Sequence, residues 1–194
     1  MSALKPVTLT TLRLYVRPMT EADVPALYAI FSDPEVMRYW SYPALTDLAQ
    51  AQEMLQQIQA SYHAGNSVRL GIERRSDGLL LGTCALFSFH EASRRAEIGY
   101  ALGRSYWGAG YMHEALSALI DYAFTTLDLH RLEADIDPRN TGSARTLERL
   151  GFQKEGHLRE RWIVNGEISD TVWYGLLRRE WQSIRSTGKS SKSS

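Results

Sequence analysis

The chain has 194 residues, 44% hydrophobic and 23% charged, which is typical of one globular domain with a well-buried core. Its 22 basic and 22 acidic residues give a formal net charge of zero, which argues against nucleic acid as a partner held by bulk charge. A single cysteine, Cys84, excludes an intramolecular disulfide, and no apolar run approaches the ~20 residues that cross a bilayer. We therefore expect a cytoplasmic protein with no membrane partner.

The N-terminal part of the chain begins with a strand pattern and continues with two helix patterns. Residues 12–17 alternate between apolar and polar, which predicts a strand. Apolar residues at helical spacing then predict one helix before Asp33-Pro34 and a longer one that ends near Gly65. Between these helices lie Tyr39, Trp40 and Tyr42, which are candidates either for the core or for the lining of an amine pocket.

The middle and C-terminal parts predict most of a sheet. Three strand patterns, over 68–73, 79–90 and 94–102, lead into a turn and a long helix that opens at about Met112. A strand, a short helix and a hairpin around Asn165-Gly166 follow. The order β-α-α-β-β-β-α-β-α-β-β is an α+β fold with a mixed, mostly antiparallel sheet of six or seven strands and helices on both faces. We expect one domain over residues 1–186 and a disordered tail over 187–194.

The turn before the long helix is the most informative stretch for function. The first backbone N–H groups of a helix have no intrahelical partner, and the helix dipole favours negative charge beside them. Gly108 and Gly110 place no side chain in front of these groups, so the turn is a candidate phosphate socket. It contains neither Gly-Lys-Ser nor Gly-Lys-Thr, and His113 stands where a dinucleotide fingerprint needs its third glycine.

The stretch Glu97-Ile98-Gly99-Tyr100, followed by Trp107-Gly108-Ala109-Gly110-Tyr111 and Glu114-Ala115, resembles the acyl-CoA turn of the GCN5-related N-acetyltransferases (GNAT). Within that superfamily it looks like the branch of the ribosomal-protein N-terminal acetyltransferases, of the RimJ and RimL type. The order of elements over roughly residues 10–178 also matches that fold. The resemblance implies that acetyl-CoA is the acetyl donor.

The resemblance also implies a set of donor-binding residues. Backbone groups of the strand end would pair with the pantetheine arm, the amides of the turn would hold the diphosphate, and Asn140 at the start of the short helix would contact the pantetheine. Arg104 and Arg145 are candidates for phosphate charge, and a solvated surface position is the alternative for each. The expected donor-binding residues are Tyr100, Ala101, Leu102, Arg104, Trp107, Gly108, Ala109, Gly110, Tyr111, Met112, Asn140, Ser143 and Arg145.

The catalytic candidates follow from what acetyl transfer to an amine requires. Glu97 is the leading general base, with Glu160 second; the alternative for Glu97 is an ion pair with Arg94 or Arg95. Many family members place a tyrosine acid seven residues after the asparagine, where this chain has Leu147. Ser143 matches the serine proposed instead in the ribosomal-protein branch. Scattered histidines give no metal-ligand spacing, so we expect no metal.

The expected activity is acetyl transfer by direct attack of a primary amine on the thioester. The leading acceptor is the α-amino group of a protein or peptide, which rests on the resemblance alone. A small amine such as an amino acid, polyamine or antibiotic is the alternative acceptor. A non-catalytic acyl-CoA-binding protein and a pure interaction domain are the other classes. The sequence leaves monomer and homodimer open.

Overall fold

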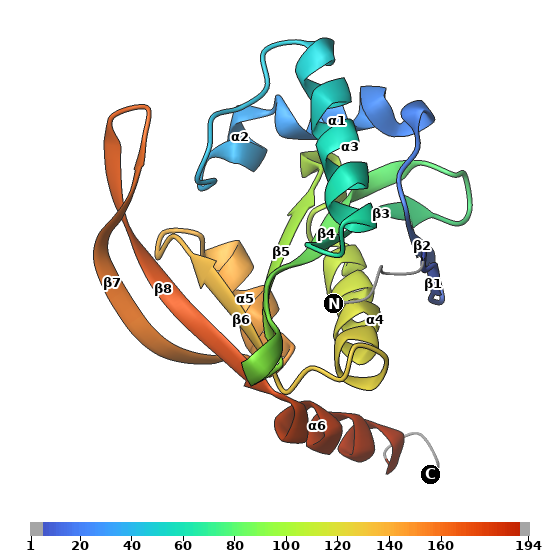
Figure 1. Cartoon of the computed structure of the whole chain (residues 1–194), viewed down its shortest axis with the longest axis vertical. Helices are drawn as coiled ribbons and strands as arrows, with labels where there is room; N and C mark the ends of the chain where they lie inside the picture. Colours follow the sequence, from blue (N-terminus) through green and yellow to red (C-terminus); the bar gives the residue numbers. More distant parts are fainter. Residues whose placement is uncertain (1–5, 191–194) are drawn as a thin grey trace.

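The computed structural model describes residues 6–190, of which 188–190 are described without side chains. Within these residues, eight strands form one sheet in the order β1-β2-β3-β4-β5-β6-β8-β7 (Figure 1). All neighbours are antiparallel except β5 and β6, which are parallel. The strands are β1 Leu9–Thr10, β2 Leu14–Arg17, β3 Val68–Arg74, β4 Leu80–His90, β5 Arg95–Leu102, β6 Arg131–Ile136, β7 Gln153–Val164 and β8 Glu167–Leu177.

Helices cover both faces of this sheet, as expected. One buried cluster joins α1, α2 and α3 to one face through residues such as Leu27, Leu55 and Leu80. The other joins α4 and α5 to the opposite face through residues such as Leu116 and Leu147. The helices are α1 Val24–Phe31, α2 Pro34–Met37, α3 Leu48–His63, α4 Tyr111–Thr125, α5 Thr141–Arg149 and α6 Arg178–Ser190, with 3-10 turns η1 Glu21–Asp23, η2 Glu91–Ser93 and η3 Arg104–Tyr106.

Two details differ from the sequence-based expectation. The sheet has eight strands rather than the expected six or seven, and the unexpected strand is Leu9–Thr10, which pairs with β2. Helix α6 continues to Ser190, so residues 187–190 are helical rather than disordered, while the rest of the expected tail lies outside the described residues. The start of α6 is held to α4, since the indole nitrogen of Trp181 donates to Asp121 at 2.7 Å.

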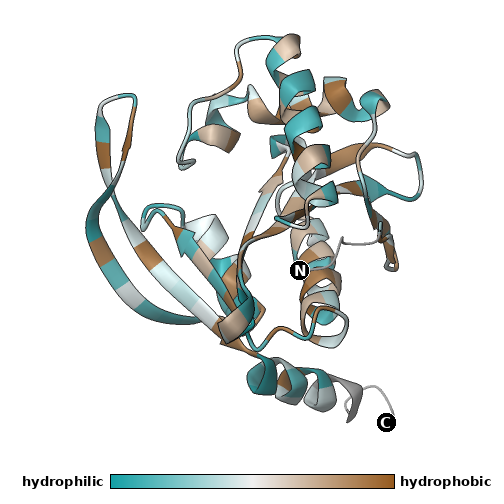
Figure 2. Ribbon diagram, in the orientation of Figure 1, coloured by the Kyte–Doolittle hydropathy of each residue, from teal (hydrophilic) through white to brown (hydrophobic). Residues whose placement is uncertain are grey.

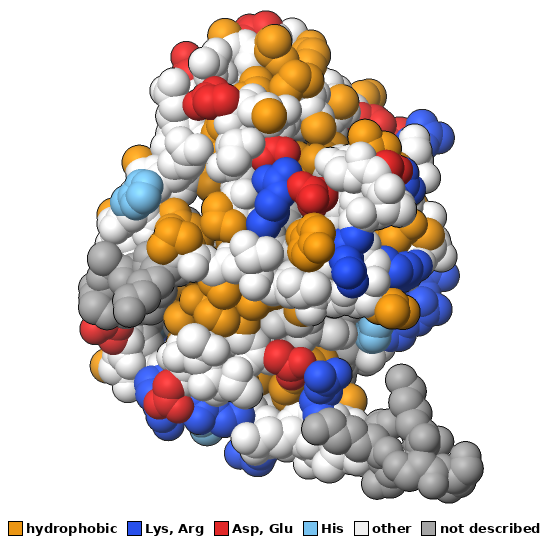
Figure 3. All heavy atoms as spheres, turned by 90° about the vertical axis from the view of Figure 1, so that its right-hand side faces the viewer, with side chains coloured by type: hydrophobic (Ala, Val, Ile, Leu, Met, Phe, Trp, Pro, Cys, Tyr) orange, Lys and Arg blue, Asp and Glu red, His pale blue; other side chains and the backbone are white. Residues whose placement is uncertain are grey.

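The surface matches the balanced composition of the chain. Helix α6 is mostly hydrophilic, whereas the central strands carry the apolar residues (Figure 2). On the face seen in Figure 3, basic and acidic side chains lie next to one another. No helix within the described residues is both long and apolar enough to cross a bilayer.

Candidate active site

Strands β5 and β6 pair over a short length and then separate. Their pairing ends where Glu97 lies opposite Glu133. Beyond that point, β5 continues to Leu102 and remains paired with β4 alone. The edge of β5 that faces the gap is therefore free to pair with an extended ligand at Tyr100 and Ala101, as an added strand would.

The glycine turn lies directly after this open edge. Gly108 and Gly110 both have left-handed backbones, with φ of 74° and 77°, which only glycine adopts at little cost. A Cβ built on Gly108 would meet no atom within 4 Å, so the turn is open there. Six consecutive backbone N–H groups, from Gly108 to His113, have no hydrogen-bond acceptor within the described residues. The predicted donor-binding residues in this run are Gly108, Ala109, Gly110, Tyr111 and Met112.

The other predicted residues near the turn have different surroundings. Trp107 is half exposed, and its indole N–H donates to the Leu102 carbonyl at 2.7 Å, so this carbonyl already has a partner. Arg104 is exposed at the start of η3, beside the turn. Arg145 is exposed on α5 and donates to the Thr141 carbonyl one turn earlier, at 3.2 Å. Of the two arginines, Arg104 is therefore the one beside the turn.

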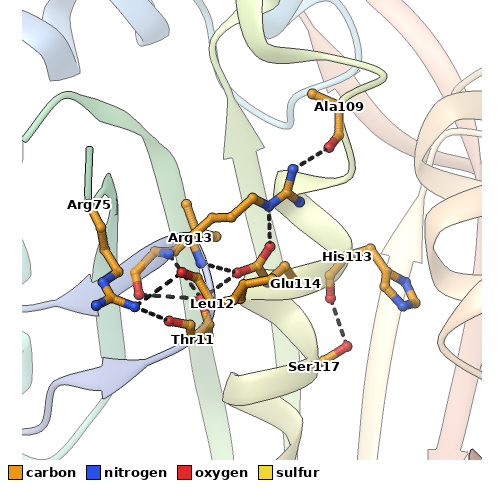
Figure 4. A network of polar contacts seen from close by, with 9 residues as sticks. Thr11, Leu12, Arg13, Arg75, Ala109, His113, Glu114 and Ser117 are labelled. Atoms are coloured by element: carbon orange, nitrogen blue, oxygen red, sulfur yellow. Dashed lines mark hydrogen bonds and ion pairs between the residues drawn. The ribbon is translucent and has the colours of Figure 1, made fainter. Parts of the chain in front are cut away.

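A residue that the sequence did not single out, Arg13, holds the turn in place (Figure 4). Its guanidinium donates to the Ala109 carbonyl at 3.0 Å and to the Glu114 carboxylate at 2.6 Å, and it lies over the Tyr111 ring at 4.4 Å. Glu114 also accepts from the Thr11 hydroxyl at 2.6 Å. Arg13 is a hundred residues away in sequence, so no local pattern reveals this contact.

Burial and hydrogen bonding act in opposite directions on Glu114. Burial favours the neutral carboxyl, but the bonds from Thr11 and from the backbone and side chain of Arg13 outweigh it and lower the pKa of Glu114. The carboxylate is therefore charged at neutral pH. It connects the segment between β1 and β2, which carries Thr11 and Arg13, to the first turn of α4, the helix that begins with the free N–H groups.

The start of α5 lies across the gap from β5. Asn140 caps this helix, since its side-chain oxygen accepts from the Ser143 backbone N–H at 3.0 Å. The Ser143 hydroxyl lies 2.7 Å from the hydroxyl of Tyr100. Leu147, at the position where many family members have a tyrosine, is fully buried in the core. The structure thus brings Tyr100, Asn140 and Ser143 together, and the contact made by the Tyr100 hydroxyl is one that the sequence did not indicate.

Glu97 lies at the point where β5 and β6 part. Burial raises its pKa, and the negative charges of Asp135 and Glu133 raise it further, against weaker opposition from Ser88 and Arg161. The expected alternative, an ion pair with Arg94 or Arg95, is not observed: within the described residues these arginines pair with Asp128 and Glu133. A carboxylate in this environment is suited to accept a proton.

The second candidate base, Glu160, has a different environment. It is exposed in a bulge of β7 with a left-handed backbone (φ 52°), where its backbone N–H donates to Asp170 at 2.8 Å. With its neighbours in β7 it lines an open hollow on the surface. Its position therefore gives it no contact with the gap between β5 and β6.

A cavity of about 430 Å³ lies beside the gap between β5 and β6. Its lining comes from the segment after α2, strands β3 to β6, the start of α5 and the tip of the β7–β8 hairpin. In Figure 1 the β7–β8 hairpin lies to the left of α2, and the hairpin and the segment after α2 both contribute to the lining. Gly99, Tyr100, Asn140 and Ser143 belong to the lining, so the cavity meets the site built from β5 and α5.

The aromatic residues at 39–42 all lie at the cavity, and two of them also pack against the core. Tyr39, Trp40 and Tyr42 all line the cavity. Trp40 also packs edge-on against Phe31 of α1, with ring centroids 5.5 Å apart, and Tyr42 packs against Trp40 at 5.2 Å. The rings of Trp40 and Tyr42 thus extend the α1–α3 core to the cavity surface.

Comparisons with known proteins agree with this geometry. The family model described as the acetyltransferase (GNAT) domain matches residues 13–153. The uncharacterized N-acetyltransferase p20 of Bacillus licheniformis is 41% identical over 90% of this chain and 98% of its own length. YdaF of Bacillus subtilis, named as a candidate ribosomal N-acetyltransferase, is 40% identical over 55% of this chain and 58% of its own. The structure of Mycobacterium smegmatis RimJ in complex with CoA-disulfide has a TM-score of 0.82 and 26% identity, and the match covers 91% of each chain.

The chain belongs to the GNAT family of acetyltransferases. It is thus an acyl-CoA N-acyltransferase that uses acetyl-CoA, and the likeness to YdaF and RimJ confirms the expected branch. The residues present fit this donor. The turn offers unpaired N–H groups and an open Gly108 for a diphosphate, and β5 offers an unpaired edge for an amide-containing arm.

Proposed function

We propose that the chain acetylates the α-amino group of a protein or peptide, with the amine bound in the 430 Å³ cavity. The site assignment rests on one observation, which is that three features follow one another along the chain. They are Glu97 at the point where β5 and β6 part, the free edge of β5 and the open glycine turn. The relatives YdaF and RimJ support the choice of acceptor.

In this proposal each residue has a defined task. The backbone N–H groups from Gly108 to His113 bind the diphosphate. The edge of β5 holds the pantetheine arm, so that the thioester lies in the gap beside the cavity. Glu97 takes the proton that the ammonium must lose before it can attack, either directly or through a water molecule. The freed amine then forms the new amide bond as the carbon–sulfur bond of the thioester breaks.

The departing thiolate needs a proton, and we assign its delivery to Ser143. Burial raises the pKa of Tyr100, so this phenol stays protonated at neutral pH and can donate to the Ser143 oxygen. Ser143 is then free to direct its own hydrogen towards the sulfur. The tyrosine thus supports the serine, although it does not occupy the position that a family tyrosine usually takes.

A small amine is the second candidate acceptor, and the size of the cavity is consistent with this class. A volume of about 430 Å³ lies in the range of ordinary small-molecule sites. It also accommodates one or two residues of a chain terminus. The two acceptor classes therefore differ in the part of the molecule outside the cavity: a peptide chain continues from the cavity mouth, whereas a small amine fits inside.

The test is thiol release from acetyl-CoA across a panel of peptides and small amines, with wild type and Glu97→Gln. We expect turnover with at least one peptide, a loss of about 10²-fold or more in the variant, and unchanged CoA affinity by calorimetry. Turnover with small amines and with no peptide would show that the acceptor is a small amine rather than a peptide. No turnover with any amine, together with CoA binding, would favour a non-catalytic binder.

A further inference from the structure

The two walls of the acceptor cavity carry opposite charges. Arg38 and Arg69 line the wall formed by β3 and the segment after α2. Asp135, Asp137 and Glu167 line the wall formed by β6, the residue that follows it and the start of β8. A molecule that enters this cavity therefore meets cations on one side and carboxylates on the other.

Most of the acidic wall is already balanced by a cation of its own. Arg139 binds Asp137 through its Nη2 atom at 2.6 Å and Glu167 through its Nη1 atom at 2.6 Å. Asp135 has no cationic partner within the described residues, and it accepts from the indole N–H of Trp162 at 3.1 Å. Asp135 is thus the carboxylate on this wall best placed to attract an ammonium group.

The basic wall has no such balance. Arg69 is half-buried, and its backbone position lies opposite Ala85, which puts it on the cavity face of the sheet. No carboxylate within the described residues pairs with Arg69 or with the exposed Arg38. Other half-buried arginines of the sheet, such as Arg17 and Arg131, each bind two carboxylates.

The neighbour of Arg69 is also incompletely satisfied. The hydroxyl oxygen of Tyr42 is fully buried and has no hydrogen-bond partner of normal geometry within the described residues. Burial raises the pKa of Tyr42, while the charge of the adjacent Arg69 and the approach of its guanidinium to the phenol oxygen act in the opposite direction. A buried hydroxyl without a partner costs free energy, and so does a half-buried guanidinium without an anion. Both costs disappear if a carboxylate binds between them, because a guanidinium and a phenol are both donors to carboxylate oxygens.

We infer that the acceptor amine also bears a carboxylate, which Arg69 and the Tyr42 hydroxyl bind while the ammonium group faces Asp135, the cavity-lining carboxylate whose charge acts on Glu97. This inference rests on the proposed function and narrows its substrate class to an amino acid or a peptide with an acidic group near its N-terminus. Arg38, at the exposed end of the same wall, adds long-range attraction for the anion. A polyamine carries only positive charges and has no group to offer Arg69.

The test uses acceptor pairs that differ only by carboxylate against amide: Ala-Asp-amide with Ala-Asn-amide, and Ala-Glu-amide with Ala-Gln-amide. Spermidine is included as a purely cationic amine. We expect wild type to prefer the carboxylate member by at least about tenfold in kcat/KM, the discrimination given by one charged hydrogen-bonded group. Arg69→Gln should remove this preference by raising the KM for the acceptor while the KM for acetyl-CoA stays unchanged.

Two further variants separate charge recognition from misfolding. Arg69→Lys keeps the charge and should restore part of the preference, and Tyr42→Phe should reduce it severalfold. Arg179→Gln, which removes an exposed arginine on α6, is the matched control and should behave as wild type. Equal rates within both pairs, a preference that survives in Arg69→Gln, or spermidine as the best acceptor would each overturn the inference.

A binding measurement keeps this test independent of turnover. N-acetyl-Ala-Asp-amide and N-acetyl-Ala-Asn-amide are the products of the first pair, and their affinity can be measured by calorimetry in the presence of CoA. Tighter binding of the aspartate product, lost in Arg69→Gln, supports the carboxylate site even if no amine reacts. Equal binding would refute it, whereas failure of turnover alone would count against the proposed function.

Discussion

The hydroxyl oxygens of Tyr100 and Ser143 lie 2.7 Å apart and connect strand β5 to the first turn of helix α5. Tyr100 is oriented towards α5 because it lies opposite Cys84, whose side chain is buried on the α4–α5 face of the sheet. The contact supplies a phenol to a site in which the usual tyrosine position is occupied by the buried Leu147.

We expect Ser143→Ala to lower kcat by about 10²-fold, the lower part of the range for general acid catalysis, with little change in the KM for acetyl-CoA. Tyr100→Phe should lower kcat by about tenfold, because it removes one supporting hydrogen bond. Steady-state kinetics with one peptide acceptor measures both variants. Wild-type kcat in Ser143→Ala would show that the thiolate leaves without help from this residue.

Glu97 should control the acidic limb of the pH–rate profile. Burial and Asp135 raise its pKa, so the base becomes protonated at a higher pH than an ordinary glutamate. Asp135→Asn removes a negative charge that disfavours the charged carboxylate, and we expect the acidic limb of kcat/KM to move to lower pH. The measurement is a pH profile with an acceptor of low amine pKa. If the acidic limb of the profile does not move in Asp135→Asn, or is unchanged in Glu97→Gln, Glu97 is not the general base.

Gly108→Ala should weaken binding of acetyl-CoA more than it weakens the fold. The left-handed backbone strains any other residue by about 1–2 kcal/mol, and the added methyl group would stand in open space in front of the free N–H groups. We expect the KM for acetyl-CoA to rise tenfold or more, with a small loss in Tm. Gly78→Ala is the matched control, because Gly78 has φ of 71° and open space in the distant β3–β4 turn. Gly78→Ala should lower Tm and leave the KM for acetyl-CoA unchanged. Equal KM values for the two variants would contradict the prediction that the turn at Gly108 binds acetyl-CoA.

Glu114→Gln should destabilise the protein in a pH-dependent way. The folded state lowers the pKa of Glu114, so its charged form contributes stability above the ordinary glutamate pKa. That contribution is lost as the pH falls through the folded-state value. We expect the Tm difference between wild type and variant to be largest near neutral pH and to shrink in acid. A difference that is constant with pH would mean that the lost contacts are not those of the charged carboxylate.

The elements with strong local patterns could be predicted from the sequence. The period of the long helix, the glycines before it and the Asn165-Gly166 hairpin each encode their conformation within a few residues, and the structure has these features. The two-residue strand β1 could not be predicted, because its existence depends on pairing with β2 rather than on its own two residues. Helix α6 extends beyond the expected boundary to Ser190, and its start docks on α4 through Trp181, a contact with a residue 60 positions away.

The candidate site likewise has features that follow from local sequence and contacts that do not. Backbone features of the turn and the cap formed by Asn140 follow from local sequence, and the structure places them as expected. Their roles in donor binding stay predictions. The contacts of Arg13, Arg69 and the Tyr100 hydroxyl join residues far apart in the chain, so a single sequence carries no signal for them. The absence of a carboxylate partner for Arg69 within the described residues is visible only once every nearby carboxylate has a position.

The contact between Arg13 and Glu114 spans 101 positions of the chain. Closing so long a loop is costly in entropy and is delayed relative to local helix formation. We therefore expect the glycine turn to acquire its final shape only after the segment that carries Arg13, just before β2, docks on α4. During refolding, helical signal should return before the ability to bind CoA, and a fragment that begins after β2 should form α4 without a working socket.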